Sequence, residues 1–243
     1  MMEKSSNDFS YIAANVETVR EKIARAAQKA GRRPEEITLM AVTKTMPAEA
    51  IAAAFDCGIT LFGENRVQEL VDKLPQLDMT GRSAHIIGHL QTNKVKTIID
   101  KADMIQSLDS LRLAQEIDRQ AETAGKIMDV LVELNIGEEP SKSGVLQQEL
   151  NGFLGDLSAF SHIRVRGLMA IPPFCPDKEK TRPYFAQIQK LFIDISQKKS
   201  DNKLMNILSM GMSSDFEVAI EEGSTMIRVG TSIFGKRNYL GGN

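Results

Sequence analysis

The stretch ITLMAVTKTMPAEAIAAAFDCG, residues 37–58, holds one complete strand-and-helix unit and sets the pattern for the whole chain. Its first half is a short apolar run with several β-branched residues, Ile37–Val42, which predicts a buried strand. Pro47 then opens a segment of helical period and Gly58 closes it, as the ends of helices favour. Lys44 stands between the two elements, just after the predicted strand.

The same alternation recurs along the chain, and amphipathic stretches separate the apolar runs. Seven further runs are predicted to be strands: Thr60–Gly63, His85–Gly88, Met104–Ser107, Val130–Asn135, Val165–Ile171, Ile207–Met210 and Met226–Val229. Strands that alternate with helices form a parallel sheet, because each parallel pair needs a crossover. Eight units in 243 residues predict a single α/β domain, a (β/α)8 TIM barrel, for which about 250 residues is typical. An open, doubly wound sheet is the alternative.

The domain organisation follows from the lack of any linker rich in Pro, Gly or Ser. We expect residues 1–243 to form one domain, with a disordered N-terminus over residues 1–8. An extra N-terminal helix is predicted from Ser10 to Ala30, before the first strand, and we expect it to pack across the barrel.

Composition excludes several classes of function. A formal net charge of −2 gives no broad basic surface for nucleic acid or an anionic membrane. The N-terminus has no signal-peptide pattern and no run is long enough to span a bilayer, so we expect a cytoplasmic protein.

Cys57 and Cys175 lack a metal-ligand spacing and are expected to be reduced thiols. His85 and His89 share a face only on a helix, and their segment is predicted to be strand and turn, so no metal site is expected.

Polar residues and glycines gather at the carboxyl ends of the predicted strands, where barrel active sites lie. Two clusters, Ser209–Ser214 and Gly230–Ser232, follow the seventh and eighth strands, after which barrels often bind a phosphate. Helix capping and turn formation are the structural alternative for these residues. Together the clusters favour a phosphate site.

Arg228 is unusual because it lies inside the apolar run MIRVG, where a barrel interior mostly holds aliphatic side chains. A buried guanidinium is charged, can only donate hydrogen bonds and needs partners. It is expected either to pair with a buried acid such as Glu133 or Glu64, or to donate to an acceptor atom of a ligand.

Lys44 has two interpretations as well. It could be a surface lysine whose stem covers apolar neighbours. At the same barrel end as an arginine and a phosphate site, however, it suggests a phosphorylated carbonyl compound, with which a lysine amine reacts once its pKa is lowered from ~10.4. A Schiff-base aldolase acting on a sugar phosphate would fit these residues too.

Five segments of the chain resemble a known family. AVTKT, FGENRVQE, HIIGHLQTNK, RGLMAIPP and LSMGMSSDFEVAIEEGSTMIRVGTSIFG occur in the order found in the YggS/PROSC family of pyridoxal phosphate (PLP) homeostasis proteins, and the match runs from about Ile37 to Arg237. The resemblance implies the barrel of the alanine racemases, a fold-type III PLP fold, without their second domain. Ala84 departs from the family, which often has an aromatic residue there.

The resemblance also implies the roles of individual residues. Lys44 would form the Schiff base (internal aldimine) with PLP, and Arg228 would face its pyridine nitrogen. Asn65 matches a residue beside the cofactor ring, with Val42 and Met210 as further ring contacts. The positions near the phosphate are Ser209, Ser213, Gly230 and Thr231.

An arginine at the pyridine nitrogen leaves that nitrogen unprotonated and weakens PLP as an electron sink. Alanine racemases use a tyrosine from their second domain as the opposing base, whereas this chain has only Tyr11, Tyr184 and Tyr239, in no matching motif. We therefore expect a monomeric, non-catalytic PLP-binding protein that serves vitamin B6 and amino-acid homeostasis and has PLP and apo PLP-dependent enzymes as partners. A small amino-acid racemase or another weak PLP enzyme is the alternative.

Overall fold

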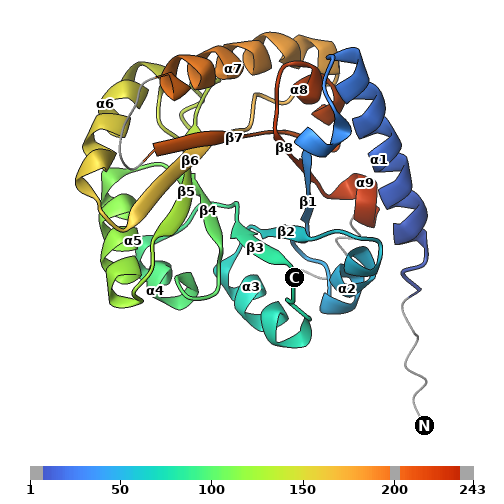
Figure 1. Cartoon of the computed structure of the whole chain (residues 1–243), viewed down its shortest axis with the longest axis horizontal. Helices are drawn as coiled ribbons and strands as arrows, with labels where there is room; N and C mark the ends of the chain where they lie inside the picture. The colour runs from blue at the N-terminus through green and yellow to red at the C-terminus, as the bar shows by residue number, and fades with distance from the viewer. Residues whose placement is uncertain (1–7, 198–202, 236–243) are drawn as a thin grey trace.

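All eight predicted strands are present and close into a parallel barrel in chain order, with β8 paired back to β1 (Figure 1). The computed structural model describes residues 8–197 and 203–235. The strands are β1 Thr38–Val42, β2 Leu61–Glu64, β3 Ser83–Ile86, β4 Met104–Leu108, β5 Met128–Leu134, β6 Ile163–Ala170, β7 Lys203–Met212 and β8 Met226–Val229. The (β/α)8 barrel is confirmed and the open sheet is excluded. Of the expected disordered N-terminus, residues 1–7 lie outside the described residues.

Helices surround the barrel. In the described residues they are α1 Tyr11–Lys29, α2 Ala48–Asp56, α3 Val67–Lys73, α4 Val95–Ile98, α5 Leu111–Thr123, α6 Leu150–Asp156, α7 Arg182–Ser196, α8 Phe216–Glu221 and α9 Thr231–Phe234. The prediction for β7 was too short, since the strand begins at Lys203 rather than Ile207. Lys203 and Asn206 interrupt the apolar pattern in that part of the strand, so the pattern did not reveal it.

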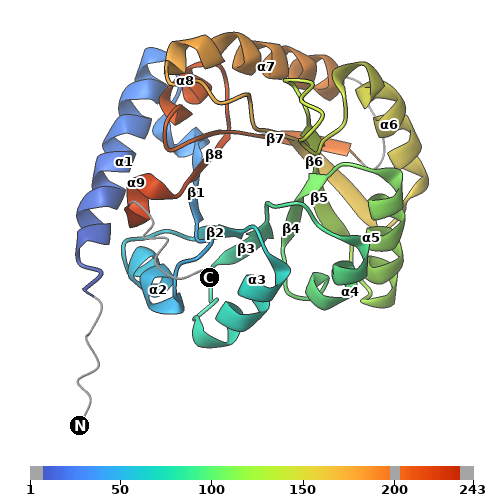
Figure 2. The ribbon, with the colours of Figure 1, turned by 180° about the vertical axis from the view of Figure 1, so that it is seen from behind.

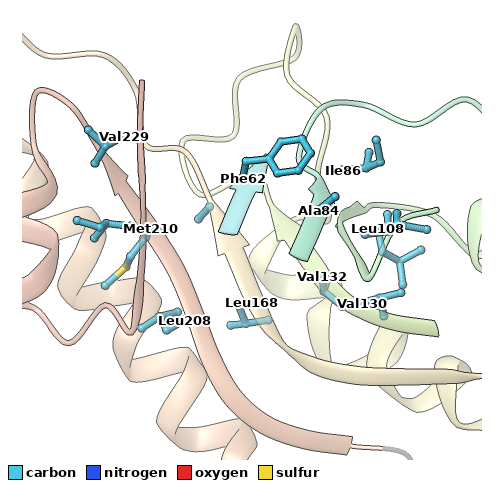
Figure 3. Packing of buried hydrophobic residues seen from close by; sticks show 14 of the residues in the cluster. Phe62, Ala84, Ile86, Leu108, Val130, Val132, Leu168, Leu208, Met210 and Val229 are labelled. Atoms are coloured by element: carbon cyan, nitrogen blue, oxygen red, sulfur yellow. The ribbon is translucent and has the colours of Figure 1, made fainter. Parts of the chain in front are cut away.

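The two faces of the strands build two separate parts of the core. Residues that point outward pack against the helices in one large cluster, which includes Phe62, Ile86, Val130, Leu168 and Val229 (Figure 3). Residues on the alternate positions fill the barrel interior in two small clusters, built around Met40, Val42, Leu61, Ile87 and Met226, and around Met104, Leu131 and Met169. The interior is therefore a packed core rather than an open channel.

The N-terminal helix was predicted correctly in extent but not in position. α1 does not cross an end of the barrel; it lies in the outer ring beside α8 and α9, as both whole-chain views agree (Figures 1 and 2). Asn15 Nδ2 donates to Ile233 O at 2.8 Å and the Tyr11 hydroxyl donates to Phe234 O at 3.1 Å. Since α9 has only four residues, it leaves room in the ring that α1 fills. No helix in the described ranges is long and apolar enough to cross a membrane.

Candidate functional site

A cavity of about 270 Å³ opens at the carboxyl ends of the strands. Its volume is close to the lower end, about 300 Å³, of typical small-molecule sites. The residues that line it are Val42, Lys44, Asn65, Ile87, Ile171, Met212, Ser213, Ser214, Arg228, Gly230 and Thr231. They follow or end β1, β2, β3, β6, β7 and β8, so segments far apart in the sequence meet at one point.

A larger cleft, of about 640 Å³, lies between α1 and the amino ends of β1 and β2. It is lined by residues such as Glu17, Arg20 and Glu35 and by none of the predicted site residues. Barrel enzymes hold their sites at the opposite, carboxyl end of the strands. We therefore take the smaller cavity as the candidate functional site.

The structure brings together all the predicted cofactor-binding residues except two. Met210 lies fully buried in the large cluster between sheet and helices, beside Leu208 and Val229 (Figure 3). The period of two along β7 places Met210 on the helix-facing side of the strand, so it does not line the cavity as a ring contact would. Ser209 does face the barrel interior, but it is fully buried and does not line the cavity. Its hydroxyl bonds to the side chains of Gln106 and Arg228.

Ser209 is one member of a row of hydrogen bonds that crosses the barrel interior. Arg228 Nη1 donates to Ser209 Oγ at 2.7 Å, and Ser209 Oγ donates to Gln106 Oε1 at 2.8 Å. Gln106 Nε2 lies 2.9 Å from Nδ1 of His85. Since the amide nitrogen can only donate, Nδ1 accepts and the His85 ring is neutral. Burial agrees with this assignment, because it lowers the pKa of His85 to about 4.

Arg228 is only 3% exposed, yet it lines the cavity. Besides Ser209 it donates from Nη2 to Ala170 O at 3.0 Å. The expected direct ion pair with Glu64 is wrong, because Glu64 lies on the other face of the sheet with Lys73 at 2.7 Å. Burial lowers the pKa of Arg228 to about 10, while the charges of Glu133 and Asp215 oppose that shift. The guanidinium therefore stays charged at neutral pH.

Glu133 on β5 is the carboxylate whose charge raises the pKa of Arg228 most, ahead of Asp215. Burial, helped by the charge of Asp109, raises the pKa of Glu133 to about 7, and Arg228 and His89 oppose the rise. Glu133 is therefore partly protonated near neutral pH. It acts on Arg228 over a distance rather than by contact, since no ion pair joins the two among the described residues.

Of the residues predicted for a phosphate site, those after β7 and β8 meet at Ser213. Its Oγ accepts from Gly230 N at 3.2 Å and from Ser232 N at 3.3 Å, so the loops after β7 and β8 are joined at the cavity wall. The Ser232 hydroxyl donates to Ser213 O at 3.5 Å. Hydroxyl and backbone N–H donors thus gather at the first turn of α9, the arrangement that binds oxyanions.

Several cavity residues were not predicted. Ile87 and Ile171 continue the interior positions of β3 and β6 by a period of two, so counting from His85 and Met169 would have found them. Met212 lines the cavity although it lies two residues after the helix-facing Met210, because the register between β7 and β8 shifts between Ser209 and Met212, so counting by two would not have found it. Gln106, which belongs to the buried row and not to the cavity wall, gave no signal either, because a single glutamine in an apolar run does not reveal its partners.

The tyrosines do not complete a racemase site in the described part of the chain. Tyr11 donates to the carbonyl of Phe234 outside the cavity, and Tyr184 packs against the large core cluster. Neither lines the cavity. Tyr239 lies outside the described residues.

Comparisons with known proteins agree with this architecture. The family model for the alanine racemase N-terminal domain matches residues 12–238. A curated relative in Escherichia coli, called pyridoxal phosphate homeostasis protein, is 43% identical over 231 residues, which is 94% of this chain and 97% of that protein.

Two solved structures are similar as well. PipY of Synechococcus elongatus, solved with PLP bound, is 35% identical with a TM-score of 0.81, over 92% of this chain and 100% of that one. The alanine racemase of Corynebacterium glutamicum is 18% identical with a TM-score of 0.65, over 93% of this chain but 63% of that one. At that identity the racemase shows a shared fold only.

Proposed function

The chain belongs to the alanine racemase N-terminal domain family, together with the pyridoxal phosphate homeostasis proteins that match it nearly end to end, and we propose that it binds PLP at the barrel mouth. The observation that carries the proposal is the meeting of Lys44, Arg228 and the Ser213 cluster around one small cavity. PLP bound in the related PipY supports it.

The residues present fit the chemistry of PLP. A lysine amine at one wall suits the aldehyde, and the hydroxyl and N–H groups at Ser213, Gly230 and Ser232 suit the phosphate. Arg228 can offer an N–H to the pyridine nitrogen, and Val42 and Asn65 lie on the wall where the ring would contact them. When bound, PLP supplies an aldehyde and an electron sink.

The role of Arg228 favours binding over catalysis. A guanidinium donates and cannot accept, so it does not keep the pyridine nitrogen protonated as a carboxylate would. Its contacts with Ser209 and Ala170 hold it in place as a donor. We therefore propose a PLP reservoir that holds the cofactor through a Schiff base to Lys44 and releases it to apo PLP-dependent enzymes. Its cytoplasmic location, its monomeric state and those partners are parts of this proposal.

The binding test uses the purified protein. After incubation with PLP and desalting, the protein should keep one cofactor per chain, and borohydride should fix it to the peptide that contains Lys44. Transfer of PLP from the loaded protein to an apo-enzyme then tests the reservoir role. A protein that retains no PLP would contradict the proposal.

A weak racemase is the second candidate, favoured by the same lysine and arginine in a racemase-type barrel. It requires proton exchange at the Cα of an amino acid. Exchange in deuterated water above the rate of free PLP would support the racemase, and exchange at the rate of free PLP would exclude it.

A further inference from the structure

Behind the cavity, between β2 and α3, three charged side chains form a cluster in which Glu64 and Lys73 are buried and Glu69 is half-buried. Lys73 is the last residue of α3, and its Nζ donates to Glu64 Oε1 at 2.7 Å and to Glu69 Oε2 at 2.9 Å. Glu64 is fully buried and Lys73 is 8% exposed. We call Lys73, Glu64 and Glu69 the α3 ion cluster. None of them lines the cavity.

The α3 ion cluster bonds to the backbone on both sides of Lys44. Its ammonium donates to the carbonyl of Thr43 at 2.9 Å, and the Thr43 hydroxyl donates to Glu64 Oε1 at 2.6 Å. On the other side, the backbone N–H of Thr45 donates to Glu69 Oε2 at 2.6 Å. These are charge-assisted hydrogen bonds, which are shorter and stronger than neutral ones.

The turn that carries Lys44 needs such support. Met46 N donates to Thr43 O at 2.9 Å and closes a four-residue turn, in which Thr45 takes the third position with φ +67°. A β-branched residue avoids positive φ, and turns that require it there use glycine or asparagine. Such a conformation persists only when its surroundings fix it. Here the bond from Thr45 to Glu69 does so.

The charges of the cluster reinforce that bond. Burial opposes ionisation of Glu69, but the hydrogen bonds from Thr45 and Lys73 outweigh it and lower the pKa of Glu69. Glu69 is therefore an anion at neutral pH, the state that accepts most strongly. One carboxylate oxygen of Glu69, Oε2, accepts from both Thr45 N and Lys73 Nζ.

We propose that Glu69 and Lys73 are positioning residues for Lys44: by fixing the turn from both sides, they hold the Lys44 side chain in the cavity and so set how long PLP stays bound. This inference rests on the proposed function. The bond to PLP forms when the amine condenses with the aldehyde and one water leaves, so its formation needs no further reactant.

Three variants of α3 separate this role from general effects on the helix. Glu69→Ala removes the acceptor of Thr45 and leaves Lys73 paired with Glu64; the Glu69 side chain is 21% exposed, so the chain should still fold. Glu69→Gln keeps an oxygen at the same place. Asp72→Ala is the control, because Asp72 is exposed on the same helix and, within the described residues, bonds to Gln68 and Gln76 and not to the turn that carries Lys44.

Two rates are measured for each variant: the release of PLP from the loaded protein during dialysis, and the acetylation of Lys44 by acetic anhydride in the unloaded protein, read by peptide mass spectrometry. We expect Glu69→Ala to release PLP about tenfold faster, as loss of a charge-assisted hydrogen bond predicts, and to change the acetylation rate. Glu69→Gln should restore both rates to within about twofold of the unmodified protein. Equal rates in Glu69→Ala and Asp72→Ala would overturn the proposal.

Failure of the proposed function would be visible separately. If the unmodified protein retains no PLP, the acetylation of Lys44 still decides whether Glu69 positions it. A further measurement does not depend on whether Glu69→Ala folds. Hydrogen exchange at the Thr45 amide should be slow in the unmodified protein and in Glu69→Gln. Exchange at the rate of an unstructured loop in the unmodified protein would overturn the proposal.

Discussion

Arg228 on β8 donates a hydrogen bond from Nη1 to the hydroxyl oxygen of Ser209 on β7, at 2.7 Å, inside the barrel. This bond holds the guanidinium of Arg228 in place, and Arg228 also lines the cavity. Because Ser209 passes the interaction on to Gln106 and His85, four strands share one polar row. Buried polar groups of this kind are costly when any member loses its partner.

Ser209→Ala tests that row. The change leaves Arg228 Nη1 and Gln106 Oε1 without their partner, so the free energy of unfolding should fall by about 1–3 kcal/mol. Urea unfolding measures the effect. Ser214→Ala is the control, since Ser214 is exposed at the rim and should change stability by no more than about 0.5 kcal/mol. An equally small effect of both substitutions would refute the row's importance.

His85 should make stability depend on pH. Its folded pKa of about 4 lies below the ordinary value of 6.5, so the unfolded chain binds the proton first as the pH falls. Stability is complete above pH 6.5 and is lost towards pH 4, with a loss of about 2 kcal/mol at pH 5. His85→Asn should remove this part of the dependence in unfolding measured at pH 7.5 and pH 5. An unchanged difference between the two pH values would show that His85 is not buried neutral.

Glu133 should change the free energy of unfolding with pH in the opposite direction to His85. Its folded pKa of about 7 exceeds the ordinary 4.5, so its neutral form favours the folded state below pH 4.5 and this advantage is lost as the pH rises to 7. Glu133→Gln keeps the side chain neutral at both pH values. It should therefore raise the free energy of unfolding, relative to the unmodified protein, at pH 8 but not at pH 4.5. We expect about 1–2 kcal/mol, because the side chain keeps some contact with solvent. Thermal unfolding that shows no gain at pH 8 would contradict the raised pKa.

Gly88 determines where Asn65 lies. A Cβ at Gly88 would come 2.4 Å from Asn65 O and 2.8 Å from Asn65 Cα, both backbone atoms. Gly88→Ala must therefore displace Asn65 and should weaken PLP binding about tenfold, measured by titration with PLP. Gly152→Ala is the matched control, since nothing lies within 4 Å of its Cβ. If the two variants bind PLP equally, Asn65 does not need its present position.

The sequence predicted the barrel because each strand and helix has its own hydrophobic period, and eight such units leave few arrangements. It predicted Lys44, Arg228 and Ser213 at one mouth because the carboxyl ends of parallel strands meet there. Resemblance to a family supplied Asn65 and the cofactor, which spacing alone did not.

What the sequence did not reveal depends on side-chain direction and on contacts between distant segments. The family resemblance suggested Met210 as a ring contact, but Met210 lies on the helix-facing side of β7, opposite to the interior side that its neighbour Ser209 occupies. The position of α1 depended on the shortness of α9, more than 200 residues along the chain. The bond between Thr45 and Glu69 joins a turn to a helix and has no signature in either segment.

The central claim is that Lys44 holds PLP in this cavity. The most direct measurement is the visible absorbance of the Schiff base after PLP loading and desalting, compared between the unmodified protein and Lys44→Ala. We predict that the unmodified protein keeps the band and loses it on borohydride reduction, which attaches the cofactor to Lys44, and that Lys44→Ala never shows it. A band of equal strength in Lys44→Ala, or none in the unmodified protein, would contradict the account.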